Sequence, residues 1–382
     1  MKILQPMRPD ITGHLVEEFS TAAAAINLGN TLASKGHTVD YIGNIERARL
    51  HPTSGQYLMS PHEHDVIQMA TALLTYREYN YDVLHLHTMN FASFNQLAKF
   101  MALNDRVILT IHVPSNIGRS FYYHQEDLLH LLRTYPNFRL VCVSNSGSYR
   151  PLKDFFGQNL PPGFDKVRMI YNGVFDPALY RLKILPVEER VRRIMFVAHM
   201  ISNKNVLHTL EMAIENGIHC MYVGRRFPYK NGKIPPAVEE YASKCETLIQ
   251  AHPGLIEHHE HLPHRQCMME MGRSQALVVL SELESFGYTP VEAASLGTPV
   301  IWLECQGLQD TMVDGVTGFE IRRKEYKNWK ARKRRAAELF HGVNTLDKTA
   351  MHDHVRDRFY ISSVADRYVE LYQEVCNGSM AN

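Results

Sequence analysis

Residues 281–300, SELESFGYTPVEAASLGTPV, decide the fold of this chain. The apolar runs 276–280 (ALVVL) and 299–303 (PVIWL) flank them, and such runs are typical of buried parallel strands. Between the runs, Pro290 is expected at the first position of a short helix that Gly297 closes. Strand, loop, helix and strand form a βαβ unit. Its loop lies at the carboxyl end of a strand, where open α/β sheets bind ligands.

Two carboxylates bracket this loop, Glu284 within it and Glu292 in the expected first helical turn. The peptide N–H groups of Phe286, Gly287 and Tyr288 lead into the helix N-terminus, where they lack intrahelical acceptors and add to the positive end of the dipole. Such a site suits phosphate, and carboxylates accept hydrogen bonds from sugar or ribose hydroxyls. On spacing alone, an ordinary surface loop with a Glu near a helix N-terminus explains the pattern equally well.

The same stretch carries a family resemblance. The sequence from Glu284 to Glu292, with Phe-Gly between them and Gly-Thr-Pro-Val at 297–300, resembles the E-x7-E signature of retaining GT-B glycosyltransferases of family GT4 (glycosyltransferase group 1). The resemblance extends over most of the chain. It implies an α/β protein with two doubly wound, Rossmann-like domains facing a central cleft, the acceptor mainly on the first and the nucleotide sugar mainly on the second.

Composition sets wider bounds. A chain of 382 residues is too long for one ordinary core, and 45% apolar with 21% charged residues is globular. The net charge of +1 provides no overall field for nucleic acid or membrane. The six Cys have neither metal-type nor disulfide-type spacing, which favours reduced thiols in the cytoplasm. The sequence shows no signal peptide and no apolar stretch of bilayer length, so we expect a cytoplasmic protein.

Strand-like and helix-like segments alternate along the chain and predict its domains. We expect an N-terminal acceptor domain over 1–180, a linker over 181–190, and a nucleotide-sugar domain over 191–355. A final helix within 356–382 should cross back to the first domain, as the resemblance implies. In the first domain, the opening strand is followed by a loop with Gly13 and a helix from about residue 14 to 35, which Gly36 caps.

Four residues of the first domain are candidates for ligand contact. Gly13 stands where the family often has a glycine pair touching the donor diphosphate, although an ordinary turn explains one glycine at least as well. His85, His87 and His112 end two strand-like runs that resemble the family's D-V-I-H-x-H and x-T-x-H strand ends. The resemblance places His112 against the transferred sugar. For His85 and His87, a structural role within a loop remains a fair alternative.

The second domain contributes the candidates for the leaving diphosphate. In the family, the loop after the first strand of this domain supplies an Arg and then a Lys, and Lys204 fits the Lys. His199 occupies the Arg position, and His is charged only near or below its pKa of ~6.5 unless a phosphate raises it. Arg225, after the next strand, is a candidate substitute cation. The resemblance also implies that Glu284 positions the sugar and Glu292 holds the ribose hydroxyls.

A histidine-rich patch, His258, His259, His261 and His264, invites a metal interpretation. Adjacent residues of a strand point to opposite faces, and no Cys pair completes a zinc set, so we expect no obligatory metal. The family resemblance suggests instead that the backbone around Leu262 contacts the nucleotide base.

Residues 322–335 are strongly basic, with Tyr326 and Trp329 interleaved. A solvated helix face is the common explanation of such a run. Because so many like charges would repel one another without a partner, we expect a binding surface here, for nucleic-acid phosphates or an anionic membrane.

The expected function is therefore retaining, metal-independent transfer of a hexosyl or pentosyl group from a nucleotide diphosphate sugar, such as a UDP- or GDP-sugar, to a hydroxyl acceptor. Glu284, His112 and Lys204 are the expected catalytic residues, and no further cofactor is expected. Two alternatives stay open. One is transfer to a hydroxylated DNA base, as in phage-type DNA glycosyltransferases. The other is a catalytically inactive GT-B binding protein, which His199 in place of Arg would favour.

Overall fold

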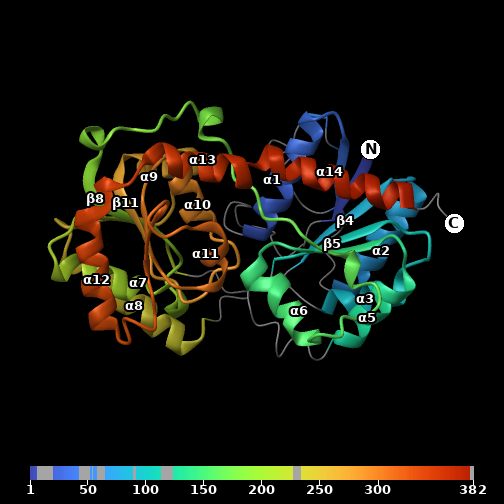
Figure 1. The fold of residues 1–382 in the computed structure, drawn as a ribbon, viewed down its shortest axis with the longest axis horizontal. Coiled ribbons are helices and arrows are strands. Elements are labelled where there is room, and N and C mark those ends of the chain that lie inside the picture. Colours follow the sequence, from blue (N-terminus) through green and yellow to red (C-terminus); the bar gives the residue numbers. More distant parts are fainter. Residues whose placement is uncertain are drawn as a thin grey trace. The chain divides into compact units, whose positions relative to one another are not determined.

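The computed structural model describes residues 1–6, 20–42, 52–53, 55–57, 65–88, 92–112, 124–226 and 234–378 (Figure 1). Its contacts divide the chain into two units. The first unit comprises Met1–Gly173 with Phe359–Asn382, and the second comprises Val174–Arg358. The segment 181–190, expected to be a linker, lies within the second unit. Gly13 and the expected start of the first helix lie outside the described residues.

The first unit is built on a parallel sheet of order β3-β2-β1-β4-β5-β6-β7. Its strands are β1 (Lys2–Pro6), β2 (Thr38–Ile42), β3 (Gly55–Tyr57), β4 (Val83–Thr88), β5 (Val107–Ile111), β6 (Phe138–Cys142) and β7 (Val167–Met169). Its longer helices are α1 (Ser20–Ser34), α2 (Asp65–Glu78), α3 (Ala92–Phe100), α5 (Gln125–Thr134), α6 (Arg150–Phe156) and α14 (Ile361–Asn377). Every residue of β5 and β6 is buried, as parallel strands covered on both faces require.

The second unit repeats the plan, with a parallel sheet of order β10-β9-β8-β11-β12-β13. Its strands are β8 (Val191–Val197), β9 (Cys220–Val223), β10 (Ile256–His259), β11 (Ser274–Val279), β12 (Val300–Leu303) and β13 (Gly318–Ile321). Its helices are α7 (Val206–Glu215), α8 (Pro236–Ala251), α9 (His264–Arg273), α10 (Tyr288–Ser295), α11 (Gln306–Thr311), α12 (Trp329–Gly342) and α13 (Lys348–Phe359). Counted within the unit, this is the doubly wound order 3-2-1-4-5-6, which reverses between β8 and β11.

The C-terminal helix α14 belongs to the first unit, where Figure 1 shows it in red beside the blue α1. Buried hydrogen bonds hold it. The hydroxyl of Tyr372 lies 2.7 Å from Nδ1 of His85, and Nε2 of His85 lies 2.8 Å from the hydroxyl of Thr110. Tyr368, one turn before Tyr372, reaches the same Thr110 hydroxyl at 3.1 Å. Two tyrosines of one helix face therefore close a polar network inside the first sheet.

One expectation about the deciding stretch is wrong in detail. The helix begins at Tyr288 rather than at Pro290, so Glu292 is its fifth residue and lies beyond the first turn. Gly287 explains the shift, because its φ of +83° turns the chain into the helix at once. Pro290 is tolerated because an N–H in the first turn would have no intrahelical acceptor.

Several basic side chains of the segment 322–335 form ion pairs that the sequence had not indicated. Lys333 is buried and pairs with Glu211 and Glu215 of α7 at 2.9 and 2.5 Å. Arg322 pairs with Asp314, Glu320 and Glu325, and Arg334 and Arg335 pair with Glu338. The premise of unpartnered like charges is therefore wrong for these residues. Lys324, Lys327 and Lys330 make no ion pair with another described residue.

Candidate active site

The loop between β11 and α10 lies at the carboxyl edge of the second sheet, beside the point where the strand order reverses. Its neighbours on the sheet fix its backbone. The N–H of Glu282 donates to the carbonyl of Asn203 at 2.8 Å, and the buried Asn205 amide donates to the carbonyl of Leu280 at 2.8 Å. On the other side, the N–H of Gly307 donates to the carbonyl of Glu284 at 3.0 Å. The loops after β8 and β12 therefore hold the Glu284 loop between them.

Lys204 and Glu284 form an ion pair, with Nζ and Oε1 2.7 Å apart. Lys204 ends the short turn after β8, and Glu284 follows β11, so the pair spans the two strands at which the sheet order reverses. Both side chains are partly exposed, at 26% and 17%. The structure thus brings together two expected catalytic residues that stand 80 positions apart.

Gly287 forms the entry to α10. A side chain at this position would collide with Leu308, and its positive φ excludes most other residues. The N–H groups of Tyr288 and Thr289 are the first of the helix and have no intrahelical acceptor, which leaves an electropositive helix end beside Glu284. Phe286 is 1% exposed, so its side chain belongs to the core and only its backbone can face a ligand.

Glu292 is 92% buried, with a relative exposure of 8%, and lies against a histidine that the sequence had not assigned to this site. Nε2 of His264 lies 2.7 Å from Oε1 of Glu292, and Nδ1 of His264 lies 3.0 Å from the hydroxyl of Tyr180. His264 had stood out only within the histidine-rich patch. Its partners lie 28 and 84 positions away, so no local pattern indicates the contact.

His199 and Arg225 follow β8 and β9 and come to the same edge as Lys204. The N–H of Met200 donates to the carbonyl of Arg225 at 2.9 Å, which ties the two loops together. At Gly224 an added side chain would collide with the carbonyl of Ala198, so the loops approach too closely for a larger residue. Both expected cationic positions therefore belong to one edge of the second sheet.

The histidine-rich patch divides among separate partners. His258 Nε2 lies 2.8 Å from the carbonyl of Gly224, whereas His259 Nε2 lies 2.9 Å from Oε1 of Glu257. In the parts of the chain that the structure describes, no three potential metal ligands gather in one place. Leu262, two residues before α9, is buried.

His112 directly follows β5 in the first unit and is 5% exposed. Its Nε2 lies 3.1 Å from Nδ1 of His87, which is also buried. Burial lowers the pKa of His112 to about 3, so the ring is neutral at pH 7. His85 is fully occupied by the network that holds α14, which supports the structural role for this residue.

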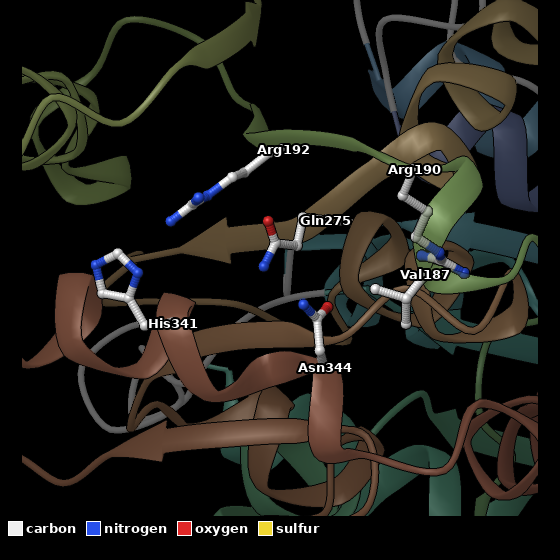
Figure 2. A pocket seen from close by; sticks show the side chains of 6 residues that line it. All are labelled: Val187, Arg190, Arg192, Gln275, His341 and Asn344. Atoms are coloured by element: carbon white, nitrogen blue, oxygen red, sulfur yellow. The ribbon is translucent and has the colours of Figure 1, made fainter.

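A pocket of about 280 Å³ opens at the opposite, amino edge of the second sheet (Figure 2). It is lined by Val187, Arg190, Arg192, Gln275, His341 and Asn344. Figure 2 shows the guanidinium of Arg190 directed away from Arg192. That guanidinium donates to the carbonyl of Leu296 at 3.1 Å and to the hydroxyl of Thr298 at 2.6 Å, and so fixes the turn after α10. None of the expected site residues lines this pocket.

Comparison with known proteins agrees with the fold. The family "Glycosyltransferase Family 4" matches residues 21–175, and the family "Glycosyl transferases group 1" matches residues 182–348. An uncharacterized 41.2 kDa protein in the cps region of Klebsiella pneumoniae is 25% identical over 78% of this chain and 80% of that protein. A glycogen synthase of Pseudomonas aeruginosa is 25% identical over 47% of this chain, and the match spans 33% of the synthase.

Solved structures share the architecture. A glycosyltransferase from Rickettsia africae is similar at a TM-score of 0.69 and 20% identity, with 98% of each chain covered. Anabaena Alr3699/HepE, in complex with UDP and glucose, has a TM-score of 0.69 at 14% identity, with 97% of this chain and 98% of that chain covered. Sucrose-phosphate synthase from Thermosynechococcus elongatus has a TM-score of 0.69 at 16% identity, covering 98% and 99%.

None of the helices in the described ranges combines the length and apolar character that a bilayer crossing requires. The two parallel, doubly wound sheets have the GT-B architecture, and the family matches account for both units. The chain belongs to the group 1 glycosyltransferases of family GT4.

Proposed function

We propose that this glycosyltransferase moves a hexosyl or pentosyl group from a nucleotide diphosphate sugar to a hydroxyl acceptor, with retention of anomeric configuration and without a metal. The observation that carries the proposal is the arrangement of Lys204, Glu284 and the amino end of α10 around one loop at the carboxyl edge of the second sheet. A cation beside the positive end of a helix suits a leaving diphosphate.

The donor is proposed to be a UDP-sugar, with a GDP-sugar as the second choice. Anabaena Alr3699/HepE has been solved with UDP-glucose, and a pneumococcal O-GlcNAc transferase with UDP and GlcNAc. Glu284 would position the sugar, Glu292 would hold the ribose hydroxyls, and His112 would contact the transferred sugar. Positive charge from Lys204, together with His199 or Arg225, would replace the divalent cation that other transferases use to neutralise a diphosphate.

Retention is proposed because the stretch from Glu284 to Glu292 resembles the signature of retaining GT4 enzymes. The two glutamates belong to one loop and helix, which suits binding roles rather than a pair of carboxyls flanking a scissile bond. In this mechanism the leaving phosphate takes the proton of the acceptor hydroxyl. The six free thiols, five of them buried, support a reducing compartment such as the cytoplasm.

The test is transfer or donor hydrolysis by Glu284→Gln, with Glu282→Gln as the matched control on the same loop. Glu282 is exposed, so its substitution should leave turnover unchanged. Glu284→Gln should lower turnover by about 100-fold or more while the melting temperature holds. Unaltered turnover in Glu284→Gln would refute the assignment. A wild-type protein that binds UDP yet neither transfers nor hydrolyses would establish the inactive, binding-only alternative.

Transfer to DNA now has less support, because the basic segment 322–335 finds much of its counter-charge within the second unit. Salt-dependent retention on DNA that disappears when Lys324, Lys327 and Lys330 are replaced by Gln would restore it. Binding of the wild type, but not of the same variant, to vesicles with anionic lipid would instead indicate a membrane surface.

A further inference from the structure

His264 connects two parts of the second unit that the sequence treats as unrelated. It is the first residue of α9 and stands directly after residues 261–263. Its ring contacts Glu292 on one side and Tyr180 on the other. The Tyr180 and Phe175 rings pack against it, with centroids 5.6 and 6.2 Å away. The imidazole is therefore fixed by packing as well as by hydrogen bonds.

The chemistry of Glu292 decides which ring nitrogen of His264 donates to it. A carboxylate oxygen can only accept, so Nε2 of His264 carries the hydrogen and donates to Glu292 Oε1. In the neutral ring Nδ1 is then an acceptor, and the Tyr180 hydroxyl donates to it. Tyr180, His264 and Glu292 thus form a directed chain of hydrogen bonds that ends on one oxygen of a buried carboxylate.

We infer that His264, oriented by Tyr180, is a positioning residue that holds the Glu292 carboxylate for the ribose of the donor and so makes the site select ribose over 2′-deoxyribose. This inference rests on the proposed function, in which Glu292 accepts from the ribose hydroxyls. With Oε1 held by His264, rotation of the carboxylate is restricted, which leaves Oε2 as the oxygen that would accept from a ribose hydroxyl. A donor that lacks the 2′-hydroxyl would leave a buried acceptor unpaired, which is a strong ground for rejection.

The place of His264 in the chain adds a second consequence. The residue that orients the ribose carboxylate directly continues the 261–263 segment, which is the expected contact of the nucleotide base. Base and ribose recognition would therefore share one fixed residue. A shift of the base contact would therefore also shift the ribose contact, and the reverse, through the backbone at the start of α9.

A histidine on the same unit provides a matched control. His259 also pairs with a carboxylate, with Nε2 2.9 Å from Glu257 Oε1, and is 36% exposed against 32% for His264. His259→Phe removes a comparable His–Glu pair away from Glu292. His264→Phe keeps a ring between Phe175 and Tyr180 but loses both hydrogen bonds. His264→Gln restores a donor near the Nε2 position, and Tyr180→Phe removes only the hydroxyl.

The experiment compares Kd values by calorimetry for the nucleoside diphosphate (UDP, GDP or ADP) that stabilises the wild type and for its 2′-deoxy form. The wild type should bind the ribose form about 10- to 100-fold more tightly. His264→Phe should bring this ratio close to one, Tyr180→Phe should lower it several-fold, and His264→Gln should largely retain it. With the sugar donor, His264→Phe should raise KM while kcat at saturation changes little.

Three outcomes would overturn the inference: a ratio near one in the wild type, an unchanged ratio in His264→Phe, or an equal loss in His259→Phe. An unchanged ratio that comes with equal weakening of both nucleotides would be the signature of damaged packing. The Kd ratio needs no turnover. A wild type that discriminates between the nucleotides but transfers no sugar therefore refutes the proposed function and leaves the inference standing.

Discussion

Acidification should open the first unit before the second. His85, His87 and His112 are the histidines that are at least nine-tenths buried among the described residues, and all lie in the first unit. Burial lowers the pKa of His85 and of His112 to about 3 and that of His87 well below its usual value. The folded first unit therefore holds neutral rings that the unfolded chain would protonate near pH 6.5.

The size of the effect follows from these values. A His with a pKa of about 3 when folded and about 6.5 when unfolded contributes stability that is present above pH 6.5 and is lost as the pH falls toward 3. Between pH 7.5 and pH 5.0 the loss is about 2 kcal/mol for each such ring, or about 4 kcal/mol for His85 and His112 together. That is a large share of the stability of a typical domain.

Hydrogen exchange followed by mass spectrometry, over a urea series at pH 7.5 and pH 5.0, measures the opening of each sheet separately, once intrinsic rates are corrected for pH. Peptides from β4 and β5 report on the first unit, and peptides from β11 and β12 report on the second. The opening free energy of β4 and β5 should fall by about 4 kcal/mol from His85 and His112, and further from His87, whereas that of β11 and β12 should fall by much less.

His85→Asn provides the matched variant, because an amide can still hydrogen-bond to Tyr372 but does not titrate. It should lower the stability of the first unit at pH 7.5 and make the loss between pH 7.5 and pH 5.0 smaller by about 2 kcal/mol, because His87 and His112 still titrate. Equal pH dependence in the two sheets, or an unchanged slope in His85→Asn, would show that these rings are not the cause.

Two substitutions in the second unit test the turns before and after α10. Gly287→Ala forces a side chain into Leu308 at a φ of +83° and should lower the stability by about 1–3 kcal/mol in thermal melting. Gly254→Ala, where an added Cβ meets nothing within 4 Å, should be close to neutral. Arg190→Met removes four hydrogen bonds and should lower the free energy of unfolding in urea by about 2–4 kcal/mol. Arg192 is an exposed neighbour, and Arg192→Met should lower it by under ~0.5 kcal/mol. Equal effects of the two substitutions would refute the anchoring role of Arg190.

The fold could be predicted because its signals are local. Runs such as 276–280 and 299–303 are continuously apolar, which is what strands covered on both faces need, and the glycine-bearing loop between them fixes a βαβ unit. The start of α10 was misplaced by two residues because the sequence rule favours proline at the first position. The positive φ of Gly287 overrides that rule and is not visible in the sequence.

The site was predictable only where a motif marks it. Glu284, Glu292 and Lys204 stand in recognisable spacing, but the Lys204–Glu284 ion pair depends on two strands becoming neighbours across the sheet. No sequence motif indicates His264, because its contacts are with residues far away in the sequence. The basic segment misled for the same reason, because the acids that pair with Lys333 lie on α7.

The Lys204–Glu284 pair sets a constraint on any donor that enters this site. Both groups are partly exposed, and a pair of this kind contributes ~1 kcal/mol at most, so a doubly charged diphosphate can take Lys204 from Glu284 at little cost. The carboxylate so released needs a new donor, and sugar hydroxyls supply it. In the proposed reaction, one exchange of partners therefore binds the diphosphate and the sugar together. A nucleotide without a sugar would free Glu284 without satisfying it, which favours the complete donor over the spent nucleotide.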